Sequence, residues 1–576
     1  MKKGFQKIIA SRFWFLWLML LLAGINYLAS DFHTRLDLTK EKRYTLSKST
    51  NTLLQNLDDE VFIEVFLKGE FPSGFQKLAN STTDFLRLLK DRTGKIHYRF
   101  IAPTDGIEGT QTTYGDSLVA LGAVPINLTV QKKTGESSNI IFPVAIMRYK
   151  GKQALVNLYP GASGRISQEE INSAEALMEY QFAKTLDKLT QTEKKSIGYS
   201  IGNGEPTDAR TFDLVKTLEQ DYEFKTIDLN VHSRIPPEVD LLIIVKPTKA
   251  FNEAEKLKID QFVMQGGKAL FFIDNLIAEQ DSLSFKPETI AFDRDLNLTD
   301  MFFRYGLRVN TDLVMDLQCD QIPIVVGGTM ENPQLEYLHW NYFPLLIPAD
   351  NQVSKGLGYV SSRFANSIDT IQVAGIRKQT LLVSSPNSRT ISTPALISLN
   401  ENRNVPEDEK FRKNAIPVGL LLEGKFTSIF RNNLSSAQRD SLASAGMTFR
   451  ETSVETKIVV VADGDIVLND LLPGSGPIPM GWNKYTYTEY LQESEAGKLF
   501  VPVANRDFLL NNVEYLVNNP AISETKNKDI VLRLLDSRKV ADQKGMWQFL
   551  NIALPILLVM LAGWIYQQIR KRKYAS

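Results

Sequence analysis

The chain has 576 residues, 43% of them hydrophobic, which is enough to build more than one packed domain. Its 66 basic and 66 acidic residues balance, but eight basic residues lie in two short terminal flanks without acidic residues, so the remaining body is net acidic. An acidic body argues against nucleic-acid binding, which needs a basic face. Cys319 is the only cysteine, which excludes an intramolecular disulfide.

Two apolar segments, residues 13–28 and 547–566, stand near the chain ends. Each is long enough to span or nearly span a bilayer core, which takes roughly 20 helical residues. Basic residues flank the outer end of each segment, and such residues favour the cytoplasmic side; they are Lys2, Lys3, Lys7, Arg12, Arg570, Lys571, Arg572 and Lys573. We therefore expect two transmembrane helices, both termini in the cytoplasm and the body outside the inner membrane. A cleaved signal peptide is the alternative for the first segment, but no clear Ala-x-Ala site follows it.

The expected organisation has six parts. They are an N-terminal transmembrane anchor (1–30), an N-terminal α/β domain (31–165), a connecting helix (166–190), a central Rossmann-like α/β domain with insertions (191–480), a C-terminal part of the extracytoplasmic region (481–545), and a C-terminal transmembrane helix with a basic tail (546–576).

The N-terminal domain is predicted from short apolar strands around two helices. A helix follows the capping candidates Thr45 and Ser47, and another lies at 85–89. Strands are expected at 61–67, 96–101, 126–130, 140–149 and 154–158. The connecting helix then begins near a capping-box pattern at 167–170 and carries an apolar stripe with helical spacing.

The central domain shows the clearest fold signal. Strands at 195–201, 224–229, 241–245 and 268–273 alternate with helices at 210–220 and 252–265. This alternation, with short connections, predicts right-handed βαβ units and a doubly wound sheet. Residues 320–455 are expected to mix short strands with polar loops, including a polar and mobile stretch at 431–445. A buried strand at 457–463, a helix at 508–517 and a strand at 530–535 complete the body.

The turn Gly202-Asn203-Gly204-Glu205 is a candidate ligand or partner site because it follows a strand of the parallel sheet. Sheets of this kind bind ligands at the carboxyl ends of their strands. The glycines would let a ligand approach the backbone while Glu205 contacts it. The simpler interpretation, which the sequence favours, is a tight strand-to-helix turn with Glu205 near a helix dipole. The third glycine of a dinucleotide-binding fingerprint is missing.

Asp463 and Asp465 form a second candidate site after the strand at 457–463. Paired acids at a strand end can bind Mg²⁺ or take part in a phosphate site. The same residues also form ordinary Asx turns, which is the favoured interpretation.

Motifs for catalysis and cofactor binding are missing. Gly267-Lys268 is followed by Ala269, so the chain has no Walker A motif and is not its own ATPase. The four histidines are far apart and form no His-Glu-x-x-His, and no Gly-x-Ser-x-Gly elbow occurs. We therefore expect a non-enzymatic protein without a catalytic, cofactor or metal site.

The ordered motifs resemble those of the GldG family, the gliding-motility ABC-transporter auxiliary proteins of Bacteroidota. The resemblance runs along most of the chain; its elements are residues 37–47, 179–190, 197–205, 305–316, Asp463-Gly464-Asp465 and the C-terminal anchor. Family members often have histidine where Asn203 stands, so no proton transfer can be assigned to that position here. The central domain of the family is similar to amidotransferase-like sheets, but Asp274 stands where those enzymes need a nucleophilic cysteine.

The resemblance implies an auxiliary subunit with three kinds of partner: a polytopic ABC-transporter membrane subunit, a cytoplasmic ABC ATPase reached through that subunit, and a substrate or envelope ligand in the periplasm. Two alternatives remain open. One is a periplasmic glycan-binding or glycan-hydrolysing domain that uses Glu205, Asp463 and Asp465, with two carboxylates about 5–10 Å apart. The other is a scaffold that only bridges proteins.

Overall fold

A computed structural model of the chain describes most of the body and the C-terminal helix. The described residues are 19–26, 45–69, 71, 73–107, 109, 112–123, 125–132, 135–160, 168–191, 193–278, 283, 286–329, 333–399, 401, 408–412, 415–444, 446–488, 503–518, 522, 524–527 and 537–574. They fall into two units, residues 1–529 and 530–576.

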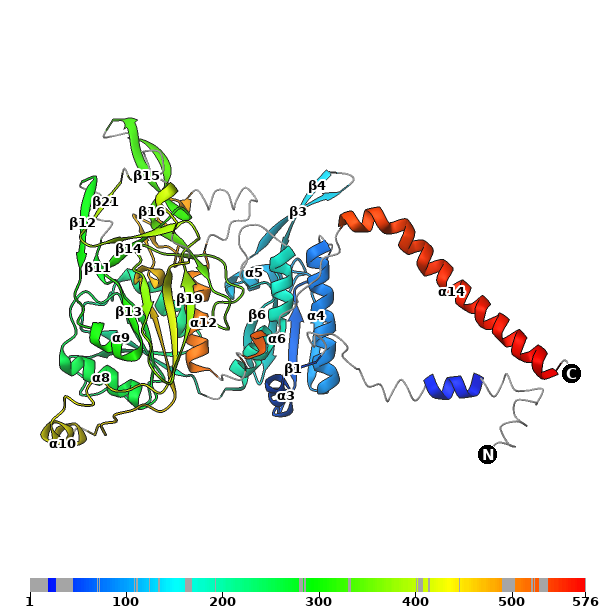
Figure 1. The fold of residues 1–576 in the computed structure, drawn as a ribbon, viewed down its shortest axis with the longest axis horizontal. Coiled ribbons are helices and arrows are strands. Elements are labelled where there is room, and N and C mark those ends of the chain that lie inside the picture. The colour runs from blue at the N-terminus through cyan, green and yellow to red at the C-terminus, as the bar shows by residue number, and fades with distance from the viewer. Residues whose placement is uncertain are drawn as a thin grey trace. The chain divides into compact units, whose positions relative to one another are not determined.

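The N-terminal domain contains a four-stranded sheet of order β2-β1-β5-β6, with three of its described helices on one face and the short helix Tyr114–Ala120 on the other (Figure 1). Its strands are β1 (Val61–Val65), β2 (Ile96–Phe100), β5 (Val144–Tyr149) and β6 (Lys152–Asn157), and a separate hairpin pairs β3 (Ile126–Lys132) with β4 (Gly135–Ile141). Its helices are α3 (Lys48–Gln55), α4 (Ser73–Arg92), α5 (Tyr114–Ala120) and α6 (Gln168–Thr190). The expected strand at 140–149 is in fact two strands, because Pro143 between them has no N–H for a ladder.

A helix, α6, occupies residues Gln168–Thr190, close to the range 166–190 expected for the connecting helix. Its apolar residues Ile171, Ala174, Met178 and Phe182 pack into the core of the N-terminal domain. This burial, rather than helix propensity alone, stabilises so long a helix.

The central sheet has a parallel half and an antiparallel half, in the order β15-β16-β19-β22-β23-β10-β9-β7-β8. The parallel half contains β7 (Ser196–Ile201), β8 (Glu223–Asp228), β9 (Leu241–Val245), β10 (Lys268–Phe272) and β23 (Thr456–Val461). The antiparallel half contains β15 (Cys319–Gly328), β16 (Pro333–Pro348), β19 (Ile376–Val383) and β22 (Pro417–Gly424), with β17 (Val360–Ser361) beside β16.

Helices cover both faces of the parallel half, as the doubly wound prediction requires. Residues 241, 243 and 245 of β9 pack with α7 (Phe212–Glu219) and α12 (Asn505–Val517) in one core. Residues 242 and 244 pack on the opposite face with α8 (Glu253–Met264) and α9 (Thr299–Tyr305). A strand buried on both faces explains the unbroken apolar run Leu241–Val245.

Residues 320–455 differ from expectation. The long hairpin β15–β16 and the strands β19 and β22 extend the central sheet, and α10 (Ser436–Ser444) lies in the stretch expected to be polar and mobile. The remaining strands form small sheets: β11 (Leu276–Ile277), β12 (Glu288–Asp293) and β21 (Ala395–Ser398); β13 (Leu307–Val309) and β18 (Ile368–Thr370); β14 (Asp312–Asp316) and β20 (Ser388–Ser392); β24 (Leu471–Leu472) and β25 (Gly476–Pro477). Register shifts interrupt the pairings β15–β16 and β19–β22.

The four 3-10 helices of the described chain are short: η1 (Ala209–Thr211), η3 (Asp408–Lys410), η4 (Asp465–Val467) and η5 (Glu524–Asn527). The described part of the second unit is the helix α14 (Ser537–Tyr574). Its segment Gln543–Arg572 is the one segment of the described residues that is long and apolar enough to cross a membrane. Residues 19–26 of the first apolar segment are helical; the rest of that segment and the expected strand at 530–535 lie outside the described residues.

Candidate functional site

The five parallel strands end at one edge of the central sheet, and charged residues follow three of them. Lys246 follows β9, Asp274 lies two residues beyond β10, and Asp463 lies two residues beyond β23. The candidate turn 202–205 follows β7 at the same edge. The edge therefore collects residues that are 28 to more than 200 positions apart in the sequence.

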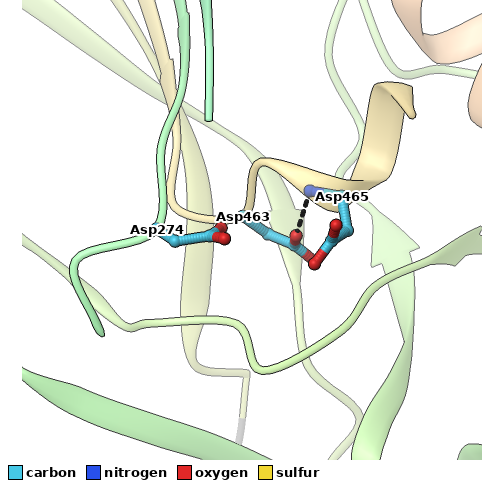
Figure 2. A group of neighbouring side chains, drawn as sticks. All are labelled: Asp274, Asp463 and Asp465. Carbon is cyan, nitrogen blue, oxygen red and sulfur yellow. Dashed lines mark hydrogen bonds between the residues drawn. The ribbon is translucent and has the colours of Figure 1, made fainter. Parts of the chain in front are cut away.

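Asp274, Asp463 and Asp465 form a compact carboxylate group at this edge (Figure 2). One oxygen of each carboxylate lies within 4.8 Å of the others. The ammonium of Lys246 lies 3.1 Å from Asp274 Oδ2 and 2.6 Å from Asp465 Oδ1. The three aspartates are the residues that could hold a divalent cation, but Lys246 already supplies a positive charge among them.

Backbone N–H groups fix the carboxylates in place. The amide of Asp465 donates to Asp463 Oδ1 at 2.7 Å, which is the Asx turn favoured from the sequence. The amide of Arg363 donates to Asp463 Oδ2 at 2.7 Å, and the amide of Gly464 donates to Asp274 Oδ1 at 2.5 Å. Asp463 thus joins two chain segments that meet only in the folded protein.

Burial and like charge act together on the acids. Burial raises the pKa of Asp463 well above its ordinary value, and the negative charges of Asp465 and Asp274 raise it further. Burial also raises the pKa of Asp274, although Lys246 opposes that shift. A single lysine therefore does not fully compensate the three acids.

Gly464 allows the lysine to approach the turn. A Cβ atom at residue 464 would lie 2.6 Å from the Cβ of Lys246, so a larger residue would force the two segments apart. Lys246 itself has a positive φ of 43°, which is uncommon for a side chain other than glycine, asparagine or aspartate. The Asp-Gly-Asp spacing is thus explained by this close packing.

A second ion pair, between Arg363 and Asp470, crosses the same edge. The guanidinium nitrogens of Arg363 lie 2.8 and 2.7 Å from the two oxygens of Asp470, a bidentate geometry. Burial alone would raise the pKa of Asp470, but the guanidinium of Arg363 lowers that pKa below its ordinary value. The pair fixes the loop after β17 to the segment after η4.

The turn 202–205 packs against the loop that follows β9. The carbonyl of Asn203 accepts hydrogen bonds from the amides of Thr248 and Lys249 at 2.9 and 2.8 Å. Gly204 has a φ of 81°, and a Cβ there would lie 2.1 Å from Thr248 Oγ1. Because α7 and α8 lie on opposite faces of the sheet, this is the topological switch point, where ligands bind in such folds. Here the chain's own loop lies over the turn.

Glu205 and Asn203 form a buried polar network in this turn. Glu205 accepts hydrogen bonds from the amide of Asn203 at 2.7 Å and from Ser200 Oγ at 3.0 Å. Asn203 Nδ2 donates to Glu255 at 2.8 Å. Burial raises the pKa of Glu205, and the charge of Glu255 adds to that effect. Glu205 is not part of the three-aspartate group, which contains no other acid of the described chain.

The sequence pointed to Asp463 and Asp465 but missed the two basic residues of the edge. Lys246 directly follows the most apolar strand. Ligands of such sheets bind at the carboxyl ends of the strands, so inspecting the residue after every parallel strand would have found Lys246. Asp274 was noted only as the replacement for a nucleophilic cysteine. Arg363 carries no signal in the sequence, because its loop reaches the edge only through the pairing of β16 and β17.

The fold and the strand-edge cluster define an α/β protein whose parallel sheet carries a lysine–aspartate charge cluster at the carboxyl ends of its strands. The chain belongs to the family described as "ABC-type uncharacterized transport system", whose model matches residues 194–511. A transport-associated auxiliary role follows from that membership. A domain of unknown function matches residues 40–148.

Individual relatives add little to this assignment. An uncharacterized protein of Borreliella burgdorferi is 23% identical over 433 residues, covering 72% of this chain and 78% of that protein. The N-terminal domain of mmIFT52 matches 56% of this chain and 98% of its own length, with 13% identity and a TM-score of 0.31. The exo-β-1,4-mannosidase Op5Man5 matches 83% of this chain and 56% of its own length, with 9% identity and a TM-score of 0.21. Neither structural similarity is strong enough to carry an argument.

Proposed function

We propose that the protein is a non-enzymatic, membrane-anchored auxiliary subunit of an ABC-type transporter complex. The observation that carries the proposal is the family match over residues 194–511 together with the apolar helix Gln543–Arg572 that follows the body. A chain that lacks a Walker A motif needs a separate ATPase if it belongs to such a complex. Its partners are then a polytopic membrane subunit and, through that subunit, a cytoplasmic ABC ATPase.

The proposed topology has two transmembrane helices in the inner membrane, with both termini in the cytoplasm and the body in the periplasm. The basic residues 570–573 after the second apolar segment support this orientation, as do those before the first. The helices would pack against the polytopic subunit and hold the periplasmic domains above it. A role in gliding motility rests on the resemblance to the GldG proteins.

The proposed ligand-facing part of the body is the strand edge that holds Asp465 and the turn 202–205. Asp465 is the most accessible of the three aspartates, with 19% of its side chain exposed, so a substrate or envelope partner would meet it first. The glycan-hydrolase alternative requires Glu205 and an aspartate of the cluster about 5–10 Å apart. Glu205 lies outside the three-aspartate group, whose carboxylate oxygens are within 4.8 Å of one another, and it accepts a hydrogen bond from Ser200 in a network of its own.

Purification in mild detergent followed by mass spectrometry tests the proposal. We expect a tagged native protein to bring along a polytopic subunit and an ABC ATPase. Replacing residues 543–572 by an unrelated apolar helix should release both partners while the protein stays in the membrane. A matched variant, Asp465→Asn, should retain both partners because it changes only the strand edge. Recovery of the protein alone, or only with envelope glycan, would contradict the transporter assignment.

A further inference from the structure

The connecting helix α6 holds the two segments that lead toward the ends of the chain. Between Glu179 and Lys184 it contacts α3, which follows the first apolar segment, and η5, which precedes the second (Figure 1). Only residues 29–46 separate the first apolar segment from Ser47, and residues 528–542 separate η5 from the helix Gln543–Arg572.

Glu179 binds the N-terminal of these segments. Its carboxylate accepts a hydrogen bond from the amide of Ser47 at 2.7 Å and another from Thr50 Oγ1 at 2.7 Å. Glu179 is buried, and Ser47 is the N-cap of α3. Hydrogen bonds to a buried charged group are among the stronger ones, so this contact fixes the start of α3 on α6.

Tyr180, the next residue of α6, binds the C-terminal of these segments. The ammonium of Lys526 in η5 lies 4.3 Å from the centroid of the Tyr180 ring, and both side chains are buried. The hydroxyl of Tyr180 donates to Glu514 of α12 at 3.0 Å, and the ammonium of Lys184 lies 2.5 Å from the other oxygen of Glu514. The contact therefore ties η5, α6 and the central domain together.

The two segments also share one apolar cluster. Ile522, just before η5, packs with Tyr180 and Ala183 of α6, and Leu53 of α3 packs against the same group. Ile522 is 4% exposed, so the cluster excludes water. Both segments therefore bury apolar surface on the same two turns of α6, and each stabilises the position of the other.

We propose that residues 179–184 of α6, here called the joint, bind both membrane-proximal segments, α3 and η5. The two segments then unfold locally and refold together, as one cooperative unit. Glu179 binds the start of α3, and its neighbour Tyr180 binds η5. Ile522 and Leu53 pack in one apolar cluster with Tyr180. The role of the joint in the complex rests on the proposed function. There, α6 would transmit conformational changes of the membrane partner to both α/β domains. The joint itself is a property of the isolated chain.

Hydrogen exchange of the full chain in detergent micelles tests the joint without any partner. The readouts are the peptides that cover residues 46–57 and 522–527. We expect Ile522→Ala to speed exchange about tenfold or more in 46–57 as well as in 522–527, because the apolar cluster loses its central side chain. We expect Glu179→Ala, which removes the carboxylate that binds Ser47 and Thr50, to speed exchange in 522–527 as well as in 46–57.

Ile171→Ala is the matched control, since Ile171 is a buried residue of the same helix that packs only into the core of the N-terminal domain. It should leave exchange in 522–527 unchanged. The milder variants Tyr180→Phe and Lys526→Met cover the case in which an alanine variant does not fold. Variants that each loosen only their own segment would overturn the joint. A failed co-purification would instead count against the transporter assignment and would leave the exchange result standing.

Discussion

The ammonium of Lys246 lies 2.6 Å from Oδ1 of Asp465, although 219 positions separate the two residues in the chain. The contact exists because β9 and β23 both flank β10 in the parallel half of the sheet and end at the same edge. It makes Lys246 the counter-charge of a buried acidic group, and this role can be tested directly.

Replacing Lys246 by methionine should destabilise the protein by about 3–5 kcal/mol, because it leaves the buried carboxylates without their counter-charge. Without the lysine, which now opposes the effect of burial, the pKa of Asp274 rises further above its unfolded value. A carboxyl group whose pKa is raised in the folded state stabilises that state as the pH falls. The loss of stability caused by Lys246→Met should therefore be larger at pH 8 than at pH 5. Urea unfolding at the two pH values measures this. Lys195→Met, which removes a more exposed pair with Asp240, should cost less than about 1 kcal/mol.

Replacing Gly464 by alanine should cost about 1–3 kcal/mol, because the new methyl group would overlap the Cβ and backbone of Lys246. The midpoint of thermal unfolding reports the loss. Gly94→Ala is the control, since no atom lies within 4 Å of the position that its Cβ would take. Equal midpoints for the two variants would show that the close approach of Gly464 and Lys246 is not required.

The stability of the folded body should rise between pH 7 and pH 9 because of Lys526. Burial lowers the pKa of Lys526 to about 7, with Lys184 acting in the same direction and Glu514 against it. In this window the unfolded chain holds a proton on Lys526 that the folded chain has lost, so stability increases by up to about 1.4 kcal/mol per pH unit. Chemical unfolding of the native chain and of Lys526→Met checks this, and the variant should lose that part of the slope. An unchanged slope would show that Lys526 titrates normally.

The topology can be tested with single cysteines because Cys319 is buried and is the only cysteine of the chain. Val231 is 77% exposed on the body, so Val231→Cys should react with a membrane-impermeant maleimide in spheroplasts. Ser576→Cys, beyond the basic tail, should react only after the membrane is opened. Labelling of Ser576→Cys in intact spheroplasts would contradict a cytoplasmic C-terminus.

Local patterns sufficed wherever a segment's structure depends on its own residues. The unbroken apolar run 241–245 predicted a strand buried on both faces, and the alternation of strands with helices predicted helices on both sides of the sheet. The stripe of α6 and the Asx turn at Asp463 were likewise visible in the sequence. In each case hydrophobic periodicity or a short-range hydrogen bond decides the conformation.

Only the tertiary structure decided which distant residues meet. The order of strands places Lys246, Asp274 and Asp463 at one edge, and the pairing of β16 with β17 brings Arg363 there. The same holds for α6, where Ser47 and Lys526 bind adjacent residues from opposite ends of the body. The sequence by itself determined the parallel sheet, the connecting helix and the apolar segments near the ends, because those follow from local periodicity. The counter-charge of the acids and the clamp on α6 depend on strand order and packing, which no local pattern encodes.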